Sequence, residues 1–362
     1  MFLIFLFCFS IYLAFILFII SGLFKHNTLP VTSLEKLPNI SIVIAARNEE
    51  INLPDLLQDL IKQEYSIEKL EIIIVDDRST DSTTSILQTA ASNYAFIKNI
   101  RIDTPSNKMT PKKYALTKGI EAATGEIIIT TDADCRVGKL WASSMAYSVL
   151  TNNCITIGYS EIINNNTLFE LYQKIDFLSI IVANAGAAGW KKFWSGTGQN
   201  LAYYKDDFFA IGGFDSVKHK VSGDDMYLVQ SISKIKGGYL HIDPNSFVKT
   251  RAVNSIQEFL NQRIRWASNS KDNYQKNPLF FLFLLTSFLF NIIICLSIFL
   301  QSNWFIMFGM KFILDGFVLV LGGKLFEKEF NPFVYSLWAV LQPIYIPVVA
   351  ILGINERYSW KK

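Results

Sequence analysis

Both ends of this chain are too apolar for the surface of a soluble protein, and this restricts its fold more than any other feature. Residues 1–24 are almost entirely apolar and residues 278–354 are mostly apolar, whereas the segment between them mixes charged and apolar side chains. About 20 consecutive apolar residues cross the ~30 Å hydrocarbon core of a bilayer. Residues 1–24 show neither a basic n-region nor a small-residue cleavage site, so they predict a retained transmembrane anchor rather than a signal peptide.

Three further membrane spans are predicted near residues 279–300, 304–322 and 333–353. The last of them contains a glutamine and two prolines, so we expect it to be kinked or re-entrant. Lys311 and Asp315 lie one turn apart inside the second of them. Two interpretations of this pair stay open: a path for lipid or sugar, or mutual neutralisation of the two charges.

The domain organisation follows from these segments. We expect a transmembrane anchor at residues 1–24, a cytoplasmic domain at residues 37–275 and transmembrane helices within residues 278–354. The central segment of about 240 residues is long enough for one large domain.

Basic residues beside the spans indicate on which side of the membrane the central domain lies. Lys25, His26 and Lys36 follow the first span, and Lys271 and Lys276 precede the second. Because cytoplasmic loops carry an excess of Lys and Arg, we expect an integral protein of a bacterial inner (plasma) membrane with a cytoplasmic central domain.

The C-terminal tail disagrees with this topology. Three spans after a cytoplasmic domain put the tail outside, yet the tail carries Arg357, Lys361 and Lys362. The exact number of spans and the side of the C-terminus are therefore left open.

The composition argues against two classes of site. The net charge is only +3 and no dense basic stripe is present, so a nucleic-acid partner is not expected. The cysteines (Cys8, Cys135, Cys154 and Cys295) are scattered, without a C-x-x-C pair or a neighbouring histidine. A zinc site or a disulfide framework is therefore not expected either.

In the central segment, apolar runs rich in β-branched residues alternate with helical patterns. Strands are predicted at residues 39–46, 71–77, 98–102 and 126–131, with helices reaching residue 63 and covering 112–123. Thr80 or Asp81 is a candidate cap for the helix after the second strand. Continuous apolar strands joined by helices predict an α/β fold, with a mainly parallel sheet covered by helices on both faces.

Polar residues follow three of the predicted strands at the point where each ends. These are Arg47-Asn48-Glu49, Asp76-Asp77 and Asp132-Ala133-Asp134. Because ligands of such sheets bind beyond the carboxyl ends of the strands, the sequence predicts a site at this edge.

The second half of the central segment has a looser pattern. Residues 154–163 predict one further strand, and residues 208–215 predict a turn at Gly212-Gly213. Helices are predicted from Asp224 to about residue 235 and over residues 255–271. We expect this half to cover the open edge of the sheet and to shape a second substrate site.

Asp132 and Asp134 are candidate metal ligands. They lie two apart at a strand end, where side chains at i and i+2 point the same way. An oxygen site with few protein ligands suits Mg²⁺ or Mn²⁺, completed by phosphate oxygens and water. The alternative is a solvated acidic turn.

Two further pairs of residues are candidates for nucleotide contact. Asp76 or Asp77 accepts hydrogen bonds from a base or ribose, unless the pair only forms a turn. Lys112 or Lys113, at a predicted helix start, reaches the nucleotide or a phosphate, unless both only face solvent.

The segment Gln262-Arg263-Ile264-Arg265-Trp266 combines unusual groups on a predicted helix. Gln262, Arg265 and Trp266 stand at i, i+3 and i+4 and share one face. A planar cation beside a flat ring suits a diphosphate next to a sugar. The alternative is an amphipathic helix with Trp266 in the core.

Asp225 is the candidate general base, and it follows Gly223-Asp224 at a predicted helix start. A hydroxyl that attacks an anomeric carbon must lose its proton, and a carboxylate placed behind it accepts that proton. Asp224 then orders the loop or holds the charge of its neighbour. In the alternative, both residues are helix caps.

In chain order these residues resemble membrane-bound family 2 glycosyltransferases, the group of cellulose synthase, poly-N-acetylglucosamine synthase and ceramide glucosyltransferase. The resemblance covers roughly residues 38–271 and is carried by I-V-I-A-A-R-N-E-E, I-I-V-D-D-R-S-T-D-S-T, K-K-Y-A-L-T-K-G-I, T-D-A-D, G-G-F-D, G-D-D and Q-R-I-R-W. The last matches the family's Q-x-x-R-W, which is far more specific than an acidic pair.

The resemblance implies a GT-A fold and an inverting hexosyltransferase that uses a nucleotide-diphosphate sugar, usually UDP-linked, and Mg²⁺ or Mn²⁺. The candidate residues for nucleotide-sugar binding are Ala45, Arg47, Glu49, Asp76, Asp77, Lys112, Asp132 and Asp134. For these residues the resemblance implies that Asp77, alone or with Asp76, contacts the uridine and that Asp132 and Asp134 form the diphosphate and metal site. It implies catalysis by Asp225 with Asp224. It also implies contact with acceptor and diphosphate by Gln262, Arg263, Arg265 and Trp266.

Two departures from the family leave alternatives open. Cellulose synthases commonly carry T-E-D where this chain has Gly223-Asp224-Asp225, so which acid serves as the base is open. The predicted spans are few for a polymer-secreting synthase, whose channel would need an accessory subunit or a second copy of the chain.

The main hypothesis is therefore transfer of a sugar to a membrane-associated lipid or glycan acceptor. Processive β-glycan synthesis is an alternative with the same chemistry. A third alternative is not an enzyme: a catalytically idle nucleotide-binding scaffold of an export complex. A fourth, a nucleotidyltransferase, would have no need of Trp266.

Overall fold

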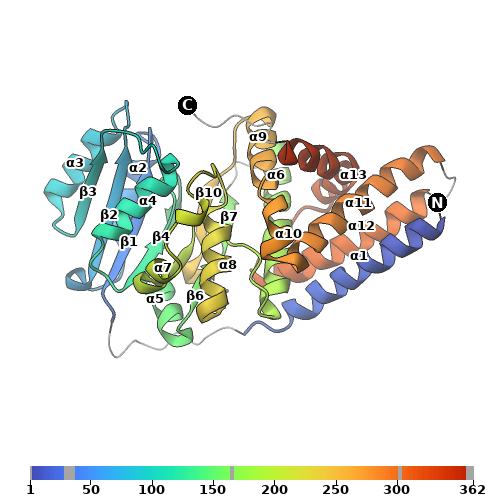
Figure 1. The fold of residues 1–362 in the computed structure, drawn as a ribbon, viewed down its shortest axis with the longest axis horizontal. Helices are drawn as coiled ribbons and strands as arrows, with labels where there is room; N and C mark the ends of the chain where they lie inside the picture. Colours follow the sequence, from blue (N-terminus) through green and yellow to red (C-terminus); the bar gives the residue numbers. More distant parts are fainter. Residues whose placement is uncertain (1, 28–36, 164–166, 301–303, 356–362) are drawn as a thin grey trace. The chain divides into compact units, whose positions relative to one another are not determined.

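The computed structural model describes residues 2–27, 37–163, 167–300 and 304–355 (Figure 1). Lys36, Arg357, Lys361 and Lys362 lie outside the described residues. The chain forms two compact units, each assembled from separate stretches. The helical unit contains Met1–Lys25, Ile162–Trp190 and Ala252–Lys362, and the sheet unit contains His26–Glu161 and Lys191–Arg251.

The sheet unit is built on a seven-stranded sheet in the order β3-β2-β1-β4-β8-β6-β9. Its strands are β1 (Ile40–Ala46), β2 (Leu70–Asp77), β3 (Ile97–Ile102), β4 (Ile127–Thr130), β6 (Ile155–Gly158), β8 (Leu201–Tyr204) and β9 (Gly238–His241). All neighbours pair in parallel except that β8 runs antiparallel to β4 and β6. The predicted mainly parallel α/β fold is confirmed.

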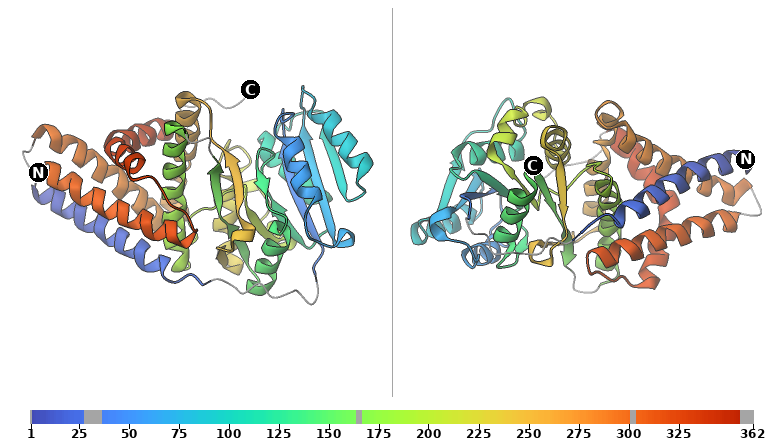
Figure 2. Two further views of the ribbon diagram at one scale, coloured as in Figure 1. Left: turned by 180° about the vertical axis from the view of Figure 1, so that it is seen from behind. Right: turned by 90° about the horizontal axis from the view of Figure 1, so that it is seen from below.

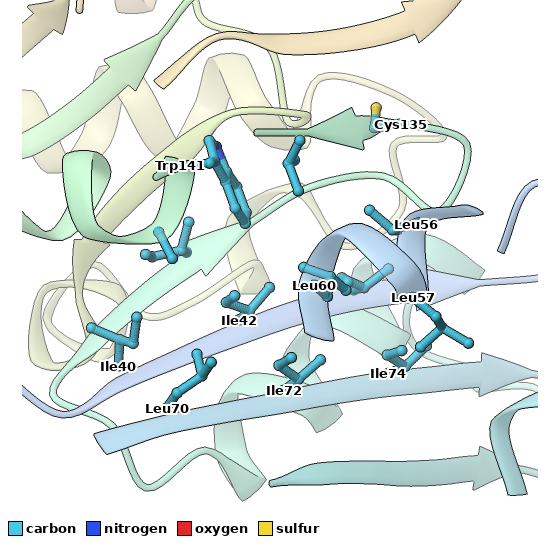
Figure 3. Close-up of a cluster of buried hydrophobic side chains, with 14 of the residues drawn as sticks. Ile40, Ile42, Leu56, Leu57, Leu60, Leu70, Ile72, Ile74, Cys135 and Trp141 are labelled. Carbon is cyan, nitrogen blue, oxygen red and sulfur yellow. The ribbon is translucent and has the colours of Figure 1, made fainter. Parts of the chain in front are cut away.

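Helices cover both faces of this sheet. They are α2 (Leu53–Ile61), α3 (Thr83–Asn93), α4 (Pro111–Ala122), α5 (Trp141–Asn152), α7 (Lys205–Ala210) and α8 (Asp224–Lys236). Side chains of α2, α3 and α5 form one core with alternate residues of β1 and β2 (Figure 3). Helix α4 packs on the opposite face, where Gly119 brings its backbone against Val43 of β1. Because β1 and β2 contact helices on both sides, their central residues form continuous apolar runs rather than an alternating pattern.

A smaller sheet has the order β5-β10-β7, with β5 at Arg136–Val137, β7 at Ser160–Ile163 and β10 at Val248–Arg251. The single strand predicted over residues 154–163 is therefore wrong, because β6 and β7 belong to different sheets. The chain changes sheet at Tyr159. Its carbonyl accepts hydrogen bonds from Asn200 Nδ2 (2.8 Å) and from the backbone N–H of Val248 (3.0 Å).

The helical unit contains the four helices that are long and apolar enough to cross a membrane in the described chain. These are α1 (Phe2–Leu23), α11 (Pro278–Leu300), α12 (Trp304–Leu325) and α13 (Pro332–Ile354). The views of Figure 2 show α1 (blue) running along α11 and α12 (orange). The predicted spans are confirmed as helices, and α13 contains its two prolines without a break in the helix assignment.

The unit also contains α6 (Leu168–Gly189), α9 (Ile256–Ala267) and the short α10 (Asn273–Lys276). Helix α6 was missed from the sequence, although its start carries a capping box. Thr167 Oγ1 accepts from the N–H of Glu170, and Glu170 accepts from the N–H of Thr167. A Thr-x-x-Glu sequence before an apolar run is a helix-start signal.

Helices α1 and α6 meet through glycine. A Cβ atom added to Gly22 would lie 1.8 Å from the carbonyl oxygen of Gly186, and one added to Gly189 would lie 2.0 Å from the carbonyl oxygen of Gly22. Only backbones without side chains approach this closely, as in membrane helix pairs joined by small residues.

Lys311 and Asp315 of α12 form a buried ion pair, and the hydroxyl of Tyr12 on α1 donates to Asp315. Of the two interpretations of this pair, mutual neutralisation has the direct geometric support. The pair also joins α12 to α1.

Two local predictions need correction. The N-cap of α3 is Ser82 rather than Thr80 or Asp81, although Asp81 Oδ1 does accept from the N–H of Thr83 (3.0 Å). The helix predicted over residues 255–271 ends at Ala267, and a turn separates it from the 3₁₀ segment Ser270–Asp272.

Candidate functional site

Four connections meet at one edge of the seven-stranded sheet. Strands β2, β1 and β4 are parallel neighbours, so the loops after Asp77, Ala46 and Thr130 leave the sheet on the same side. Strand β8 is antiparallel to β4 and pairs Leu201 with Thr130. The segment that precedes Leu201 therefore comes to this edge as well.

Asp132 and Asp134 lie in a turn just beyond β4. The argument from strand alternation does not hold, because β4 ends at Thr130 and the N–H of Cys135 closes a turn on the carbonyl of Asp132 (3.1 Å). The two carboxylates are nevertheless close. Burial, together with the charges of Asp132 and Glu49, raises the pKa of Asp134 to about 6.

Lys112, in the first turn of α4, reaches this acidic turn. Its Nζ donates to Asp132 Oδ1 at 2.7 Å and lies 3.9 Å from Asp224 Oδ2. Burial lowers the pKa of Lys112, but the charges of Asp132 and Asp224 outweigh it, and the net pKa is raised. Lys112 is thus a permanent cation between the acids that follow β4 and those that begin α8.

Lys113 has a different role. Its side chain is buried, and its Nζ donates to the backbone carbonyls of Lys220 (2.6 Å) and Ser222 (3.4 Å). It therefore holds the loop that leads into α8. Of the two lysines, Lys112 is the one whose ammonium group faces the acidic turn, and its contact with the nucleotide or a phosphate stays a prediction.

Asp224 and Asp225 occupy the first turn of α8, after Gly223 at the N-cap position. Asp225 Oδ1 accepts from the N–H of Met226 (2.7 Å), and its Oδ2 accepts from the N–H of Gly198 (3.3 Å). Burial and the charge of Asp224 raise the pKa of Asp225 to about 6. A partly exposed carboxylate with this pKa suits a general base at neutral pH.

Gly198 marks the centre of this cluster, and sequence analysis missed it. A Cβ atom built on Gly198 would lie 3.6 Å from Asp225 Cβ, 3.8 Å from Asp224 Oδ2 and 3.8 Å from Lys112 Nζ. Its carbonyl accepts from Thr130 Oγ1 at the end of β4 (3.1 Å). The glycine-rich composition of residues 195–198 was the available signal for this close approach.

The loops after β1 and β2 are joined to each other. The N–H of Asn48 donates to Ser79 Oγ (3.0 Å), and the N–H of Thr80 donates to Asn48 Oδ1 (2.8 Å). Asn48 and Arg78 adopt left-handed φ values of 54° and 56°, which non-glycine residues rarely adopt. The mutual hydrogen bonds hold both loops in these conformations.

Three of the predicted nucleotide-binding residues lie on these loops or beside them: Arg47 and Glu49 follow β1, and Asp77 is the last residue of β2. Asp77 pairs with Arg78 (2.8 Å) and lies 3.8 Å from Arg47. Glu49 lies near enough to Asp134 to raise its pKa. Ala45 is a half-buried residue of β1 that pairs with Val75.

Asp76 is buried and its contacts are internal. Its Oδ1 accepts from the N–H of Ser79 (3.0 Å), while its Oδ2 accepts from Thr84 Oγ1 (2.6 Å) and Arg101 (2.6 Å). Burial by itself would raise the pKa of Asp76, but these hydrogen bonds and the charge of Arg101 outweigh burial, and the pKa is lowered. The expectation that Asp76 contacts the nucleotide is corrected: it anchors the loop after β2.

The Q-R-I-R-W segment lies on α9 of the helical unit, so Gln262, Arg265 and Trp266 do share one helix face. Arg263 is buried and pairs with Asp176 at 2.6 Å. Its predicted contact with acceptor or diphosphate is therefore corrected. The convergence of the other three with the acidic cluster stays a prediction.

The acidic turn fits a divalent cation that takes most of its ligands from substrate. Within the described chain, no group of three or more His, Cys, Asp or Glu residues could hold a metal ion. Asp132 and Asp134 offer two partly exposed carboxylates with crowded negative charge. Such a pair suits Mg²⁺ or Mn²⁺ bound with phosphate oxygens and water.

Comparison with known sequences identifies the central segment. Residues 41–223, half of the chain, match the family model "Glycosyl transferase family 2". The probable glycosyltransferase YdaM of Bacillus subtilis is 26% identical over 266 residues, which cover 70% of this chain and 62% of that protein. The beta-monoglucosyldiacylglycerol synthase of Nostoc sp. is 26% identical over 264 residues, which cover 66% of this chain and 50% of that protein. The match thus spans only part of the length of these relatives.

Among solved structures, a mannosyltransferase from Pyrobaculum calidifontis in complex with GDP-Man and Mn²⁺ superposes with a TM-score of 0.61. The match covers 97% of this chain and 96% of that one at 18% sequence identity. At this identity the likeness shows a shared GT-A-like fold and no more.

Proposed function

Because this chain belongs to glycosyltransferase family 2, we propose that it moves a sugar from a nucleotide-diphosphate sugar to a hydroxyl of a membrane-associated lipid or glycan. A UDP-sugar is the first candidate donor. The transfer inverts the anomeric centre, and the sheet unit performs it on the cytoplasmic side of the membrane.

One observation carries this proposal: the cluster around Gly198 contains both a candidate base and a candidate diphosphate site. Asp225 approaches Gly198 from α8, while Lys112 joins Asp224 to Asp132 beside the same glycine. These groups come from three distant parts of the sequence. A nucleotide-binding scaffold without catalysis would not need a carboxylate with a pKa of about 6 at this place.

The proposed step is a single displacement. The acceptor oxygen bonds to the anomeric carbon as its proton passes to Asp225. On the opposite face of the sugar, the bond from that carbon to the diphosphate oxygen breaks, and the nucleoside diphosphate leaves with the bonding electrons. The N–H groups of Gly198 and Met226 keep the Asp225 carboxylate in place.

Positive charge near the leaving group comes from two sources. Lys112 supplies a fixed ammonium next to Asp132. A Mg²⁺ or Mn²⁺ ion held by Asp132 and Asp134 would neutralise charge on the departing diphosphate.

Two observations support an acceptor in the membrane. Four helices of the described chain are long and apolar enough to span a bilayer. The Nostoc relative is named as a beta-monoglucosyldiacylglycerol synthase. A Staphylococcus haemolyticus protein that is 25% identical over 218 residues is named as a 4,4'-diaponeurosporenoate glycosyltransferase. That match covers 57% of this chain and 56% of the relative.

A donor panel tests the proposal. Membranes that contain the full chain are incubated with labelled UDP-sugars and GDP-sugars, and organic-extractable products are separated from high-mass polymer. We expect label in the glycolipid fraction for one donor. Label only in polymer would favour processive glycan synthesis, and failure to consume any donor would overturn the proposal.

Asp225→Asn identifies the base, with Asp206→Asn as the matched control. Asp206 is an exposed aspartate in the first turn of α7. Asp225→Asn is expected to lower kcat by roughly 10²–10⁴-fold while donor binding is retained. Asp206→Asn should keep full activity. Normal turnover by Asp225→Asn would remove this residue from the base role.

A further inference from the structure

A single buried carboxylate in the helical unit joins three helices. Asp176 of α6 pairs with Arg263 of α9 at 2.6 Å, and the side chains of the two are only 5% and 3% exposed. Asp176 Oδ1 also accepts from Trp338 Nε1 of α13 (3.3 Å), and Tyr345 of α13 donates to its Oδ2 (3.5 Å). A buried ion pair needs such extra hydrogen bonds to offset the desolvation of its charges.

Aromatic rings enclose the guanidinium of Arg263. The guanidinium carbon lies 4.6 Å from the ring centroid of Phe259 and 4.3 Å from that of Trp266, both on α9. These cation–π contacts press the Trp266 ring against Arg263. The orientation of Trp266 therefore depends on the position that Asp176 gives to Arg263.

The same guanidinium determines which way Gln262 points. Arg263 Nη1 donates a hydrogen bond to Gln262 Oε1. A guanidinium has only donors, so it must face the oxygen of the Gln262 amide. The NH₂ group of Gln262 is thereby turned away from Arg263, where it is a donor for an acceptor such as a phosphate oxygen.

Helix α13, a candidate membrane span, packs closely on the end of α9. A Cβ atom added to Gly353 of α13 would lie 2.8 Å from Ala267 Cβ and 3.0 Å from the carbonyl oxygen of Ile264. The ring of Tyr345 stacks on Phe259 at 5.9 Å. Helix α9, which carries the Q-R-I-R-W segment, is thus linked to α13 at two places: directly at its C-terminal end, and through Asp176.

We propose that Asp176 and Arg263 are positioning residues that orient Gln262 and Trp266 of the Q-R-I-R-W segment. This rests on the proposed function together with the sequence-based prediction that this segment contacts the diphosphate and the acceptor. Trp338 and Tyr345 of α13 donate hydrogen bonds to Asp176, so α13 helps to hold Asp176 and Arg263 in place. Arg263 itself does not contact substrate.

The test compares binding of UDP with binding of UMP to the full chain in detergent or nanodiscs (GDP and GMP if the donor panel selects a GDP-sugar). If Gln262 donates to the terminal phosphate of the diphosphate, the orientation of its amide affects the binding of UDP and leaves the binding of UMP unchanged, so Asp176→Asn should separate the two ligands. We expect UDP binding to weaken by about tenfold, the usual effect of losing a hydrogen bond to a charged group, and UMP binding to change by less than about twofold.

A double variant provides the decisive control. In Gln262→Leu the donor is already lost, so adding Asp176→Asn should weaken UDP binding no further. Equal losses for UDP and UMP, or a full additional loss in the double variant, would overturn the proposal.

Two milder variants keep the test usable if Asp176→Asn does not fold. Arg263→Lys keeps the charge but replaces the guanidinium, whose separate nitrogens reach Asp176 and Gln262, by a single ammonium group. Trp338→Phe removes one N–H from Asp176. Arg263→Lys should show the same selective loss for UDP. If the wild-type chain binds and turns over the donor and Arg263→Lys behaves identically, the positioning role is rejected and the proposed function is retained. A wild-type chain that binds no nucleoside diphosphate would instead reject the proposed function.

Discussion

The ammonium group of Lys112 lies 2.7 Å from Oδ1 of Asp132, and this ion pair joins the start of α4 to the turn after β4. Lys113, the next residue, donates instead to backbone carbonyls that lead into α8. The two adjacent lysines therefore differ: we propose that Lys112 acts beside the diphosphate, whereas Lys113 holds the loop before α8.

Replacement of each lysine by methionine should separate these tasks. Lys112→Met removes the cation beside the diphosphate site and should lower kcat/KM by roughly 100-fold or more, with little change in thermal stability. Lys113→Met leaves buried carbonyls without their donor and should lower the unfolding temperature. Initial rates and thermal unfolding of both variants check this. Equal effects of the two variants on rate and stability would contradict it.

The activity should depend on the protonation of Asp225. Its pKa is raised to about 6, first by burial and then by Asp224, while Lys112 and the two N–H groups oppose the shift. A base must be unprotonated, so kcat/KM should be level above about pH 7 and fall by about tenfold per pH unit below about 6. Rates are measured at saturating Mn²⁺, which keeps Asp134 ionised. An unchanged rate down to pH 5 would rule out this base.

Removal of divalent cations should abolish transfer. Treatment with a chelator is expected to stop the reaction, and added Mn²⁺ or Mg²⁺ should restore it, because two carboxylates need a cation to bind a diphosphate between them. Asp134→Ala should raise the Mn²⁺ concentration needed for half-maximal rate. The exposed-residue variant Asp206→Asn is the control and should show the wild-type requirement. Full activity in excess chelator would disprove the metal site.

His241 should make folding sensitive to acid. It is buried beside Ser144 (2.8 Å), and burial lowers its pKa to about 4, against the opposing effects of Asp243 and Ser144. The unfolded chain takes up a proton near pH 6.5 that the folded chain refuses, so stability is present above pH 6.5 and is lost as pH falls toward 4. The loss approaches about 3 kcal/mol.

A comparison with His241→Gln isolates this contribution. The unfolding temperature of the wild type should exceed that of the variant at pH 7, and the difference should shrink steadily down to pH 4.5. A difference that stays constant over this range would show that His241 does not titrate as described.

The sequence predicted the strands and their acidic ends because these are local patterns. The apolar runs of β1 and β2 are buried on both faces, and each ends in polar residues at the same edge of the sheet. Parallel neighbours then bring those ends together without further information. For this reason the residue pattern alone was sufficient to predict that Asp77 and Asp132 lie at the same edge of the sheet.

The errors at Arg263 and Asp76 have a different origin, since they concern which side chains of a local element are buried. Arg263 lies next to Gln262 in sequence, and only the presence of Asp176 on another helix shows that it points inward. Asp76 and Asp77 look equivalent in sequence, but Asp76 meets Arg101 from β3. Gly198 lacked a side chain that could mark it, although three charged groups surround it.

The glycine contact between α1 and α6 gives the N-terminal helix a second role besides anchorage. Any sufficiently hydrophobic segment would anchor the protein in the bilayer. A transmembrane helix from another protein with a bulky side chain at residue 22, however, could not pack against Gly186. A chimera whose N-terminal helix is replaced by an unrelated transmembrane helix is therefore expected to insert in the bilayer without forming the contact with α6.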